Sequence, residues 1–250
     1  VMQIVRYQKV GNDKYKIFLD NKETITLYEN VILANNLLLN KEIDKEKLDI
    51  LIKQNDIEDL YSKVLSYIAY RIRSVKEVRG YLVKKGANEY LTGYIIDKLK
   101  KTGYLNDDLF CKYYILDKIN LTLDGPFKMR KYLQDNDISN ETIDKYLNSY
   151  EDNFKERIDK LINKYLKLNN KLCGKALKTK IYNNLVNLGY DKNMILSLIN
   201  NYDYNNNSNA KKIYDDLYKK YSSKYEGYEL DMVIKQKMYQ KGYNMNEINM

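Results

Sequence analysis

Guanidinium groups are the side chains of this chain whose placement most clearly indicates binding chemistry. Three of its six arginines, Arg71, Arg73 and Arg79, lie within nine residues of one another, although 37 of the 43 basic residues are lysines. A guanidinium can bind a phosphate or a carboxylate through two parallel hydrogen bonds, which an ammonium cannot do. In a composition that favours lysine, a cluster of arginines therefore indicates contact with such groups.

Lysines surround these arginines, and similar groups of basic residues occur farther along the chain. We call twelve of these residues the basic face and predict that they bind the partner. They are Arg71, Arg73, Lys76, Arg79, Lys84, Lys85, Lys128, Arg130, Lys131, Lys175, Lys178 and Lys180. Alternatively, Arg71 and Arg79 pair with Glu77 or with a neighbouring helix end. Nearby tyrosines could stack on bases or pack as half-buried residues; they include Tyr67, Tyr70, Tyr81 and Tyr132.

The overall charge agrees with a polyanionic partner. The chain of 250 residues has a formal net charge of +9, which favours nucleic acid first and an acidic protein surface second. A lysine-rich compositional bias is the alternative explanation, because the 27 tyrosines and many asparagines are typical of the same bias. The charge is therefore consistent with binding but does not establish it.

The residues that most enzymes need are missing. The sequence has no histidine, which excludes histidine-dependent catalysis and histidine-ligated metal sites. Cys111 and Cys173 form no metal-binding pair, and Asp107 and Asp108 are explained as the start of a helix. We find neither a glycine-rich phosphate-binding loop nor a dinucleotide-binding glycine motif. We therefore expect no enzyme, no cofactor and no metal. The absence of a signal peptide and of a long apolar run predicts a cytoplasmic protein without a membrane segment.

A short apolar pattern that usually ends in glycine recurs four times and defines the elements that position the basic residues. Its copies are spaced by 51, 52 and 53 residues, which indicates a tandem array of supersecondary units. Stacked units share a core and leave one long surface for a partner. The copies are Val78/Leu82/Gly86, Met129/Leu133/Asp137, Ile181/Leu185/Gly189 and Ile234/Met238/Gly242.

Helix caps recur with the same period and predict three helices in each unit. Ser74 and Glu77 form a capping box, Gly125 and Pro126 suit a helix start, and Leu177 has no cap, so that its helix should start earlier. The first helices are expected at about Asp107–Lys118, Phe154–Leu168 and Ala210–Tyr221. Residues with good capping side chains precede the third helices; they are Asn88, Ser139, Asp191 and Asn244.

The first 30 residues alternate polar and apolar side chains and predict a small antiparallel β-meander. Helical stretches are expected around Val31–Leu39 and Lys45–Lys53, followed by a long helix over Asp56–Arg71. The predicted fold is mainly α, with tandem three-helix repeats that form an elongated, curved array behind the meander. We divide it into residues 1–55 (meander and short helices), 56–105 (repeat 1), 106–152 (repeat 2), 153–204 (repeat 3) and 205–250 (repeat 4, partly truncated). Residues 202–209 have the composition of a flexible linker.

Three segments of the chain carry more specific motifs. They are YIAYRIRSVKEVRGYLVKKG (67–86), KKTGYLNDDLFCKYYI (100–115) and DGPFKMRKYLQDNDI (124–138). Their pattern resembles that of the RecX family, and the resemblance extends more weakly to the remaining repeats and to the longer, Gram-positive-type leader. The matching positions are Arg71, Arg73, Ser74, Glu77, Leu105, Asn106, Asp107, Gly125 and Pro126. The chain departs from the family's Lys-Gly pair at Asn136-Asp137 and at Leu188-Gly189.

The resemblance implies a non-enzymatic regulator of the RecA recombinase. RecX-like proteins are arrays of three-helix repeats that lie along the RecA–single-stranded DNA filament, block its extension and lower its ATPase, strand-exchange and co-protease activities. The expected partners are therefore the RecA filament and single-stranded DNA, bound directly or within the filament, and the expected state is a monomer. The alternative is a general single-stranded nucleic-acid-binding helical-repeat protein that competes with RecA for DNA.

Overall fold

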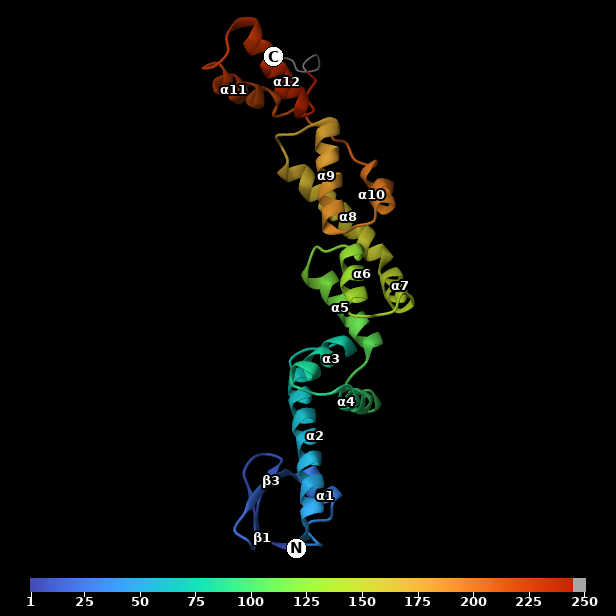
Figure 1. The fold of residues 1–250 in the computed structure, drawn as a ribbon. Coiled ribbons are helices and arrows are strands. Elements are labelled where there is room, and N and C mark those ends of the chain that lie inside the picture. The colour runs from blue at the N-terminus through green and yellow to red at the C-terminus, as the bar shows by residue number, and fades with distance from the viewer. Residues whose placement is uncertain (245–250) are drawn as a thin grey trace. The chain divides into compact units, whose positions relative to one another are not determined.

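The chain is mostly helical, with one small sheet at its N-terminus (Figure 1). The computed structural model describes residues 1–244. The chain divides into two compact units, Val1–Phe110 and Cys111–Met250. The mainly α fold with an N-terminal antiparallel sheet confirms the fold class expected from the sequence. No helix in the described part of the chain is both long enough and apolar enough to span a membrane.

The N-terminal sheet has four antiparallel strands in the order β3-β2-β1-β4. Their alternating apolar side chains, such as Ile4, Ile17 and Leu27, are buried in one core, which confirms the predicted meander. The short fourth strand was not predicted; it pairs with the start of the first strand. The strands are β1 (Met2–Lys9), β2 (Lys14–Leu19), β3 (Thr24–Tyr28) and β4 (Glu42–Ile43).

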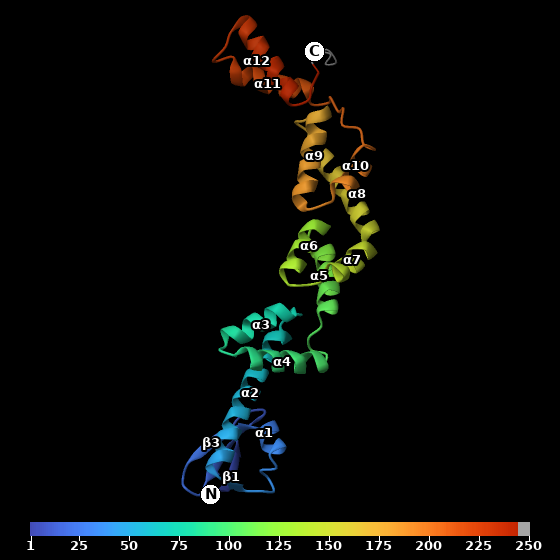
Figure 2. The same cartoon turned by 45° about the vertical axis from the view of Figure 1, so that its right-hand side comes forward.

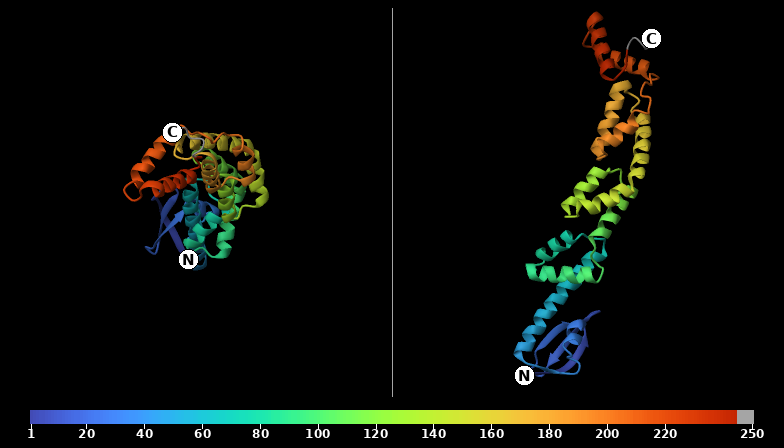
Figure 3. Two further views of the ribbon diagram at one scale, coloured as in Figure 1. Left: turned by 90° about the horizontal axis from the view of Figure 1, so that it is seen from above. Right: turned by 90° about the vertical axis from the view of Figure 1, so that its right-hand side faces the viewer.

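Two helices, α1 (Glu29–Ala34) and α2 (Lys45–Ala69), pack beside this sheet (Figure 3). The prediction of two separate helices over Lys45–Lys53 and Asp56–Arg71 was wrong, because α2 is continuous through residues 54–56. No glycine or proline interrupts this stretch. Asn55 and Asp56 resemble a helix start, but the side chain of Asn55 instead accepts a hydrogen bond of 2.8 Å from the backbone N–H of Tyr28. A single helix therefore links the sheet to the first repeat.

The first repeat consists of the C-terminal half of α2 together with α3 (Val75–Lys84) and α4 (Glu89–Lys101). Val78 and Leu82 of α3 are fully buried against apolar side chains of α2 and α4. The predicted capping box is present: Ser74 Oγ accepts from the Glu77 N–H at 3.1 Å, and the Ser74 N–H donates to Glu77 Oε2 at 3.0 Å. The capping box fixes where α3 begins, directly after Arg71 and Arg73.

The remaining helices repeat this arrangement (Figure 2). Asn88, Ser139 and Asp191 accept backbone N–H groups of their helices, which confirms three of the four predicted caps. The helix expected after Asn244 lies outside the described residues. The helices are α5 (Asp107–Leu121), α6 (Pro126–Asp135), α7 (Asn140–Ser149), α8 (Glu151–Leu168), α9 (Gly174–Leu188), α10 (Lys192–Ile199), α11 (Ala210–Tyr221) and α12 (Gly227–Gln240).

Within Cys111–Met250, the recurrent glycines join one repeat to the next. Gly189 follows α9 and has a φ of 91°. Its carbonyl accepts the N–H of Phe127 at 2.8 Å. The Gly125 N–H donates to the carbonyl of Leu188, the residue before Gly189, at 2.7 Å. The segment that ends at Gly242 contacts the start of α9 in the same way. The Cys173 N–H donates to the carbonyl of Lys241, the residue before Gly242, at 2.9 Å. The glycines therefore end the helices and also permit close backbone contact between repeats.

The segment after α10 is held by its tyrosines, although its composition predicted a flexible linker. Tyr204 is buried and donates its hydroxyl to the Ile199 carbonyl at 2.6 Å. The Tyr204 carbonyl accepts the N–H of Gly174 at 2.8 Å, and the Tyr202 hydroxyl donates to Asp159 at 2.8 Å. The asparagines of this segment suggested a linker, but two aromatic rings attach it to the third repeat.

Candidate functional site

Arg71 lies between α2 and α3 and is bound to a carboxylate of α3. Arg71 donates from Nη1 to Glu77 Oε2 at 3.2 Å and forms a second, parallel contact between Nη2 and Oε1. It also donates to the Ile72 carbonyl at 3.0 Å. Glu77 is therefore the bidentate partner of Arg71 as well as part of the capping box. Of the two interpretations left open by the sequence, the pairing of Arg71 with Glu77 is the one that the structure contains.

Arg73 packs against an aromatic ring instead of facing solvent. Its guanidinium carbon lies 4.0 Å from the centre of the Tyr67 ring, and only 15% of its side chain is exposed. Tyr67 in turn stacks on Tyr81, with ring centres 4.2 Å apart and planes 9° apart. The Tyr67 ring therefore has a guanidinium on one side and another ring beside it. This arrangement leaves little of Tyr67 for stacking on a base.

A second pair of stacked tyrosines occurs in the second repeat. Tyr114 of α5 and Tyr132 of α6 have ring centres 4.4 Å apart and planes 13° apart. Tyr81 and Tyr132 are 51 residues apart, which is the period of the repeat. Burial raises the pKa of Tyr114 to about 12. Three of the four tyrosines named from the sequence therefore pack on other rings, whereas Tyr70 is 88% exposed.

Two further arginines form ion pairs between the second and third helices of their own repeats. Arg79 of α3 contacts Glu89 of α4 at 2.5 Å, and Arg130 of α6 contacts Asp144 of α7. Arg79 and Arg130 are also one repeat period apart. Because each forms an ion pair inside its own repeat, both contribute to the scaffold. The pairing of Arg79 with a neighbouring helix start again corresponds to the alternative that the sequence left open.

The lysines of the basic face are more available than its arginines. Lys128 pairs with Asp124 at 3.3 Å and Lys178 donates to Asn200 at 2.6 Å. Lys85 lies 5.4 Å from the centre of the Tyr81 ring, and the Lys76 side chain is exposed. Four lysines of the basic face are exposed and form no ion pair, hydrogen bond or ring contact with any residue that the structure describes. We call them the open lysines: Lys84, Lys131, Lys175 and Lys180.

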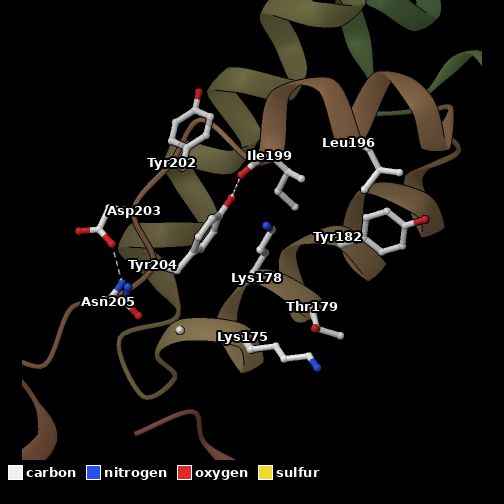
Figure 4. A pocket seen from close by; sticks show the side chains of 11 residues that line it. Lys175, Lys178, Thr179, Tyr182, Leu196, Ile199, Tyr202, Asp203, Tyr204 and Asn205 are labelled. Atoms are coloured by element: carbon white, nitrogen blue, oxygen red, sulfur yellow. Dashed lines mark hydrogen bonds between the residues drawn. The ribbon is translucent and has the colours of Figure 1, made fainter. Parts of the chain in front are cut away.

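The third repeat contains a cavity of about 650 Å³ that sequence reasoning did not identify (Figure 4). Lys175, Lys178 and Tyr182 enter it from α9, and the segment after α10 closes another side. The two lysines belonged to the predicted basic face, but the aromatic lining was missed, because Tyr202 and Tyr204 stand in the asparagine-rich stretch. The full lining consists of Gly174, Lys175, Lys178, Thr179, Tyr182, Leu196, Ile199, Tyr202, Asp203, Tyr204 and Asn205.

Metal chemistry finds no support in the described residues. Within residues 1–244, no group of three or more Cys, Asp or Glu side chains is arranged to hold a metal ion. Both cysteines, Cys111 and Cys173, are buried and are not joined in a disulfide.

Comparisons with known proteins give a consistent picture. Residues 61–99 match the family model described as "RecX, first three-helix domain". The chain is 30% identical to the regulatory protein RecX of Bacillus velezensis, over 97% of this chain and 94% of the relative. It is 29% identical to that of Bacillus subtilis, over 96% and 93%. A crystal structure of regulatory protein RecX shares the fold, with a TM-score of 0.69 and 21% identity, over 81% of this chain and all of the other.

Proposed function

The chain belongs to the RecX family of regulatory proteins, and we propose that it regulates the RecA–single-stranded DNA filament. In this proposal it binds the filament without catalysing a reaction, blocks its extension, and lowers ATP hydrolysis, strand exchange and co-protease activity. Such a target would place the protein in the cytoplasm. The observation that carries the proposal is the length of the match, because the relatives are similar along almost the whole chain and not in one repeat alone.

The repeats suit a partner that is itself repetitive. A filament presents the same surface again and again, so that successive repeats of one monomer can each contact it. Several weak contacts on one chain add up to strong binding, because each later contact forms within the complex that the first one made. We retain the division into residues 1–55, 56–105, 106–152, 153–204 and 205–250 as the proposed set of binding modules.

The basic face supplies the proposed contacts, and the open lysines are its main component. Their ammonium groups have no carboxylate partner among the described residues, so that binding a phosphate does not require an internal ion pair to break. Lysines 84, 131, 175 and 180 belong to α3, α6 and α9, the second helices of the first three repeats. We propose that the arginines hold these helices in place while the lysines contact the filament.

The ATPase of RecA filaments tests this proposal. We expect half-maximal inhibition at a protein concentration far below that of the DNA sites, because one molecule that blocks extension affects many RecA subunits. The alternative function, general binding to single-stranded nucleic acid, requires the protein to cover the DNA, so that inhibition would appear only near saturation. Inhibition that needs saturating protein and that disappears with excess DNA would reject the proposed function.

A second experiment separates the two functions by binding alone. The protein is sedimented with RecA filaments and, at the same salt concentration, with bare single-stranded DNA. We expect more protein to sediment with the filament, and we expect this difference to persist as salt is raised. Binding to DNA through lysines alone weakens steeply with salt. Equal sedimentation in both mixtures at every salt concentration would favour the general nucleic-acid-binding function.

A further inference from the structure

We propose that the cavity of the third repeat holds one nucleotide of a single-stranded nucleic acid, with the phosphate near Lys175 and Lys178 and the base near Tyr182. This inference rests on the proposed function, because it names the part of the chain that contacts the strand. The proposal combines a cavity, two cationic side chains and an aromatic wall in one repeat (Figure 4).

The anion-binding end lies where α9 begins. Lys175 and Lys178 project from the first turns of this helix into the cavity. The N–H of Gly174, the first residue of the helix, donates to the Tyr204 carbonyl at 2.8 Å, which holds the segment after α10 beside these lysines. The two ammonium groups therefore line the same region of the cavity, which favours a phosphate. The carboxylate of the lining, Asp203, accepts the N–H of Asn205 at 2.9 Å.

The lysine at the centre of the cavity is held in position. Lys178 Nζ donates to Asn200 Oδ1 at 2.6 Å and lies 5.9 Å from the centre of the Tyr204 ring. Tyr204 is fixed by its own hydrogen bond to the Ile199 carbonyl. Neither of these two neighbours of the ammonium, a neutral amide and an aromatic ring, is a carboxylate. Lys178 can therefore meet an anion without losing a carboxylate partner.

The other side of the cavity suits a base. Tyr182 of α9 and Leu196 of α10 line it, and Leu196 is 47% exposed. In contrast with Tyr67 and Tyr132, the Tyr182 ring is not stacked on another ring among the described residues. Tyr182 is half-buried, and bases stack on the accessible face of such rings with little regard to sequence. A volume of about 650 Å³ lies within the range of small-ligand sites.

The combination selects a single strand over a duplex and over an acidic peptide. A duplex keeps its bases stacked on one another, so that none can lie flat against Tyr182. An acidic side chain would use the lysines but would gain nothing specific from the aromatic wall. A nucleotide of an unpaired strand uses both ends of the cavity, because its phosphate and its base are separated by the sugar.

Two lysines of the same helix provide a matched test. Lys175 and Lys180 are both open lysines of α9, but only Lys175 lines the cavity. Binding of the full chain to a labelled single-stranded dT oligonucleotide of about 20 nucleotides is measured by fluorescence anisotropy, without RecA. We expect Lys175→Gln to weaken binding by about threefold to tenfold and Lys180→Gln to weaken it less. Equal effects of the two substitutions would overturn the proposal.

The aromatic wall is tested by a second pair of variants. Tyr182→Leu keeps an apolar side chain but removes the ring, and we expect it to weaken single-strand binding by about tenfold. Tyr182→Phe keeps the ring and should bind as the original chain does. Binding to a duplex of the same length should not change in either variant. If Tyr182→Leu leaves single-strand binding unchanged, or weakens duplex binding equally, the assignment of a base to this wall is wrong.

Further measurements distinguish the possible ligands of the cavity, and they distinguish failure of this inference from failure of the proposed function. Thymidine monophosphate should displace the oligonucleotide poorly, and tight binding of the mononucleotide alone would show that the site takes free nucleotides instead of a strand. If Lys175→Gln and Tyr182→Leu weaken binding to RecA without DNA but leave oligonucleotide binding intact, the occupant is an acidic protein segment and the proposal fails. The proposed function fails separately, if the original chain binds the oligonucleotide as expected but does not inhibit RecA.

Discussion

Gly125 and Gly189 touch through their backbones, although they belong to successive repeats of the array. A Cβ atom on Gly125 would lie 2.5 Å from the carbonyl oxygen of Gly189 and 2.6 Å from the backbone nitrogen of Tyr190. Both neighbours are backbone atoms, which cannot move aside as a flexible side chain can. Gly125 has an ordinary φ of −89°, so it is the lack of space that requires glycine here.

Gly125→Ala should therefore destabilise the unit Cys111–Met250. We expect a loss of about 1–3 kcal/mol in the free energy of unfolding, because the added methyl group must push two helix ends apart. Urea unfolding followed by circular dichroism measures this loss. Gly80→Ala in α3 is the comparison, because a Cβ there meets nothing within 4 Å and alanine favours a helix by about 0.5–1 kcal/mol over glycine. Similar stability of the two variants would contradict the steric argument.

Arg73→Ala should lower stability more than it lowers binding. The substitution removes the guanidinium that covers the Tyr67 ring and lies 3.8 Å from Glu77. We expect a cost of about 1–2 kcal/mol, because the contact is mostly shielded from water. Lys84→Ala on α3 should change stability by less than about 0.5 kcal/mol. Thermal unfolding of both variants measures the change in stability. An unchanged unfolding temperature for Arg73→Ala would mean that Arg73 does not stabilise the fold and is a candidate to contact the partner.

The open lysines should carry the effect on the filament. We expect the double variant Lys84→Gln with Lys131→Gln to inhibit the RecA ATPase less at each concentration, with unfolding unchanged. Each lost phosphate contact should also lower the salt dependence of single-strand binding by about 0.7 in the slope of log K against log salt. Lys101→Gln with Lys212→Gln removes the same charge from exposed positions outside the basic face. If that control reduces inhibition equally, net charge alone explains the effect.

The periodic features of this fold could be predicted from the sequence, because they follow from local rules. Caps such as Ser74 and Ser139 depend on hydrogen bonds within a few residues, and the apolar pattern depends on helical spacing. The break between two helices that we expected near residue 55 was wrong, because the role of Asn55 depends on a contact with a residue that is distant in the chain. Asn55 serves as the partner of Tyr28, 27 residues away, and no local pattern contains that information.

The candidate site was less predictable, because charge in a sequence does not show which charges are already paired. Arg71 and Arg79 were singled out as rare guanidinium groups, and both have carboxylate partners that are close in the chain. The cavity depends on the aromatic residue Tyr204, which lies 26 residues from Lys178. Only the folded chain brings the two together. Residue types indicated the chemistry, and tertiary contacts decided which residues can perform it.

Asp59 of α2 is a polar link between the helix and the N-terminal sheet, and it makes stability depend on pH. Its carboxylate accepts hydrogen bonds from Lys63 at 2.6 Å, Tyr28 Oη at 2.8 Å and Lys14 at 3.1 Å. The hydrogen bond from Lys63, with those from Tyr28 and Lys14, holds the pKa of Asp59 well below its ordinary value of 3.8. The folded state therefore prefers the ionised carboxylate more strongly than the unfolded state does.

The sign of the pH effect follows from this lowered pKa. Above about pH 4 the carboxylate is ionised in both states and its stabilising contacts are fully present. As the pH falls below 4, the unfolded state binds a proton first, and the contribution of Asp59 is lost. We expect Asp59→Asn to lower the free energy of unfolding by about 1–2 kcal/mol at pH 7, and we expect this difference to shrink toward pH 2.

Urea unfolding of Val1–Met250 at pH 7 and at several values below pH 4 measures the difference between the original chain and Asp59→Asn. Asp49→Asn is the control, because Asp49 is an exposed residue of the same helix that makes no ion pair with a described residue. Its effect should be small and should vary little with pH. If the difference in the free energy of unfolding between the original chain and Asp59→Asn stays constant down to pH 2, the Asp59 side chain stabilises the sheet by its shape and not by its charge.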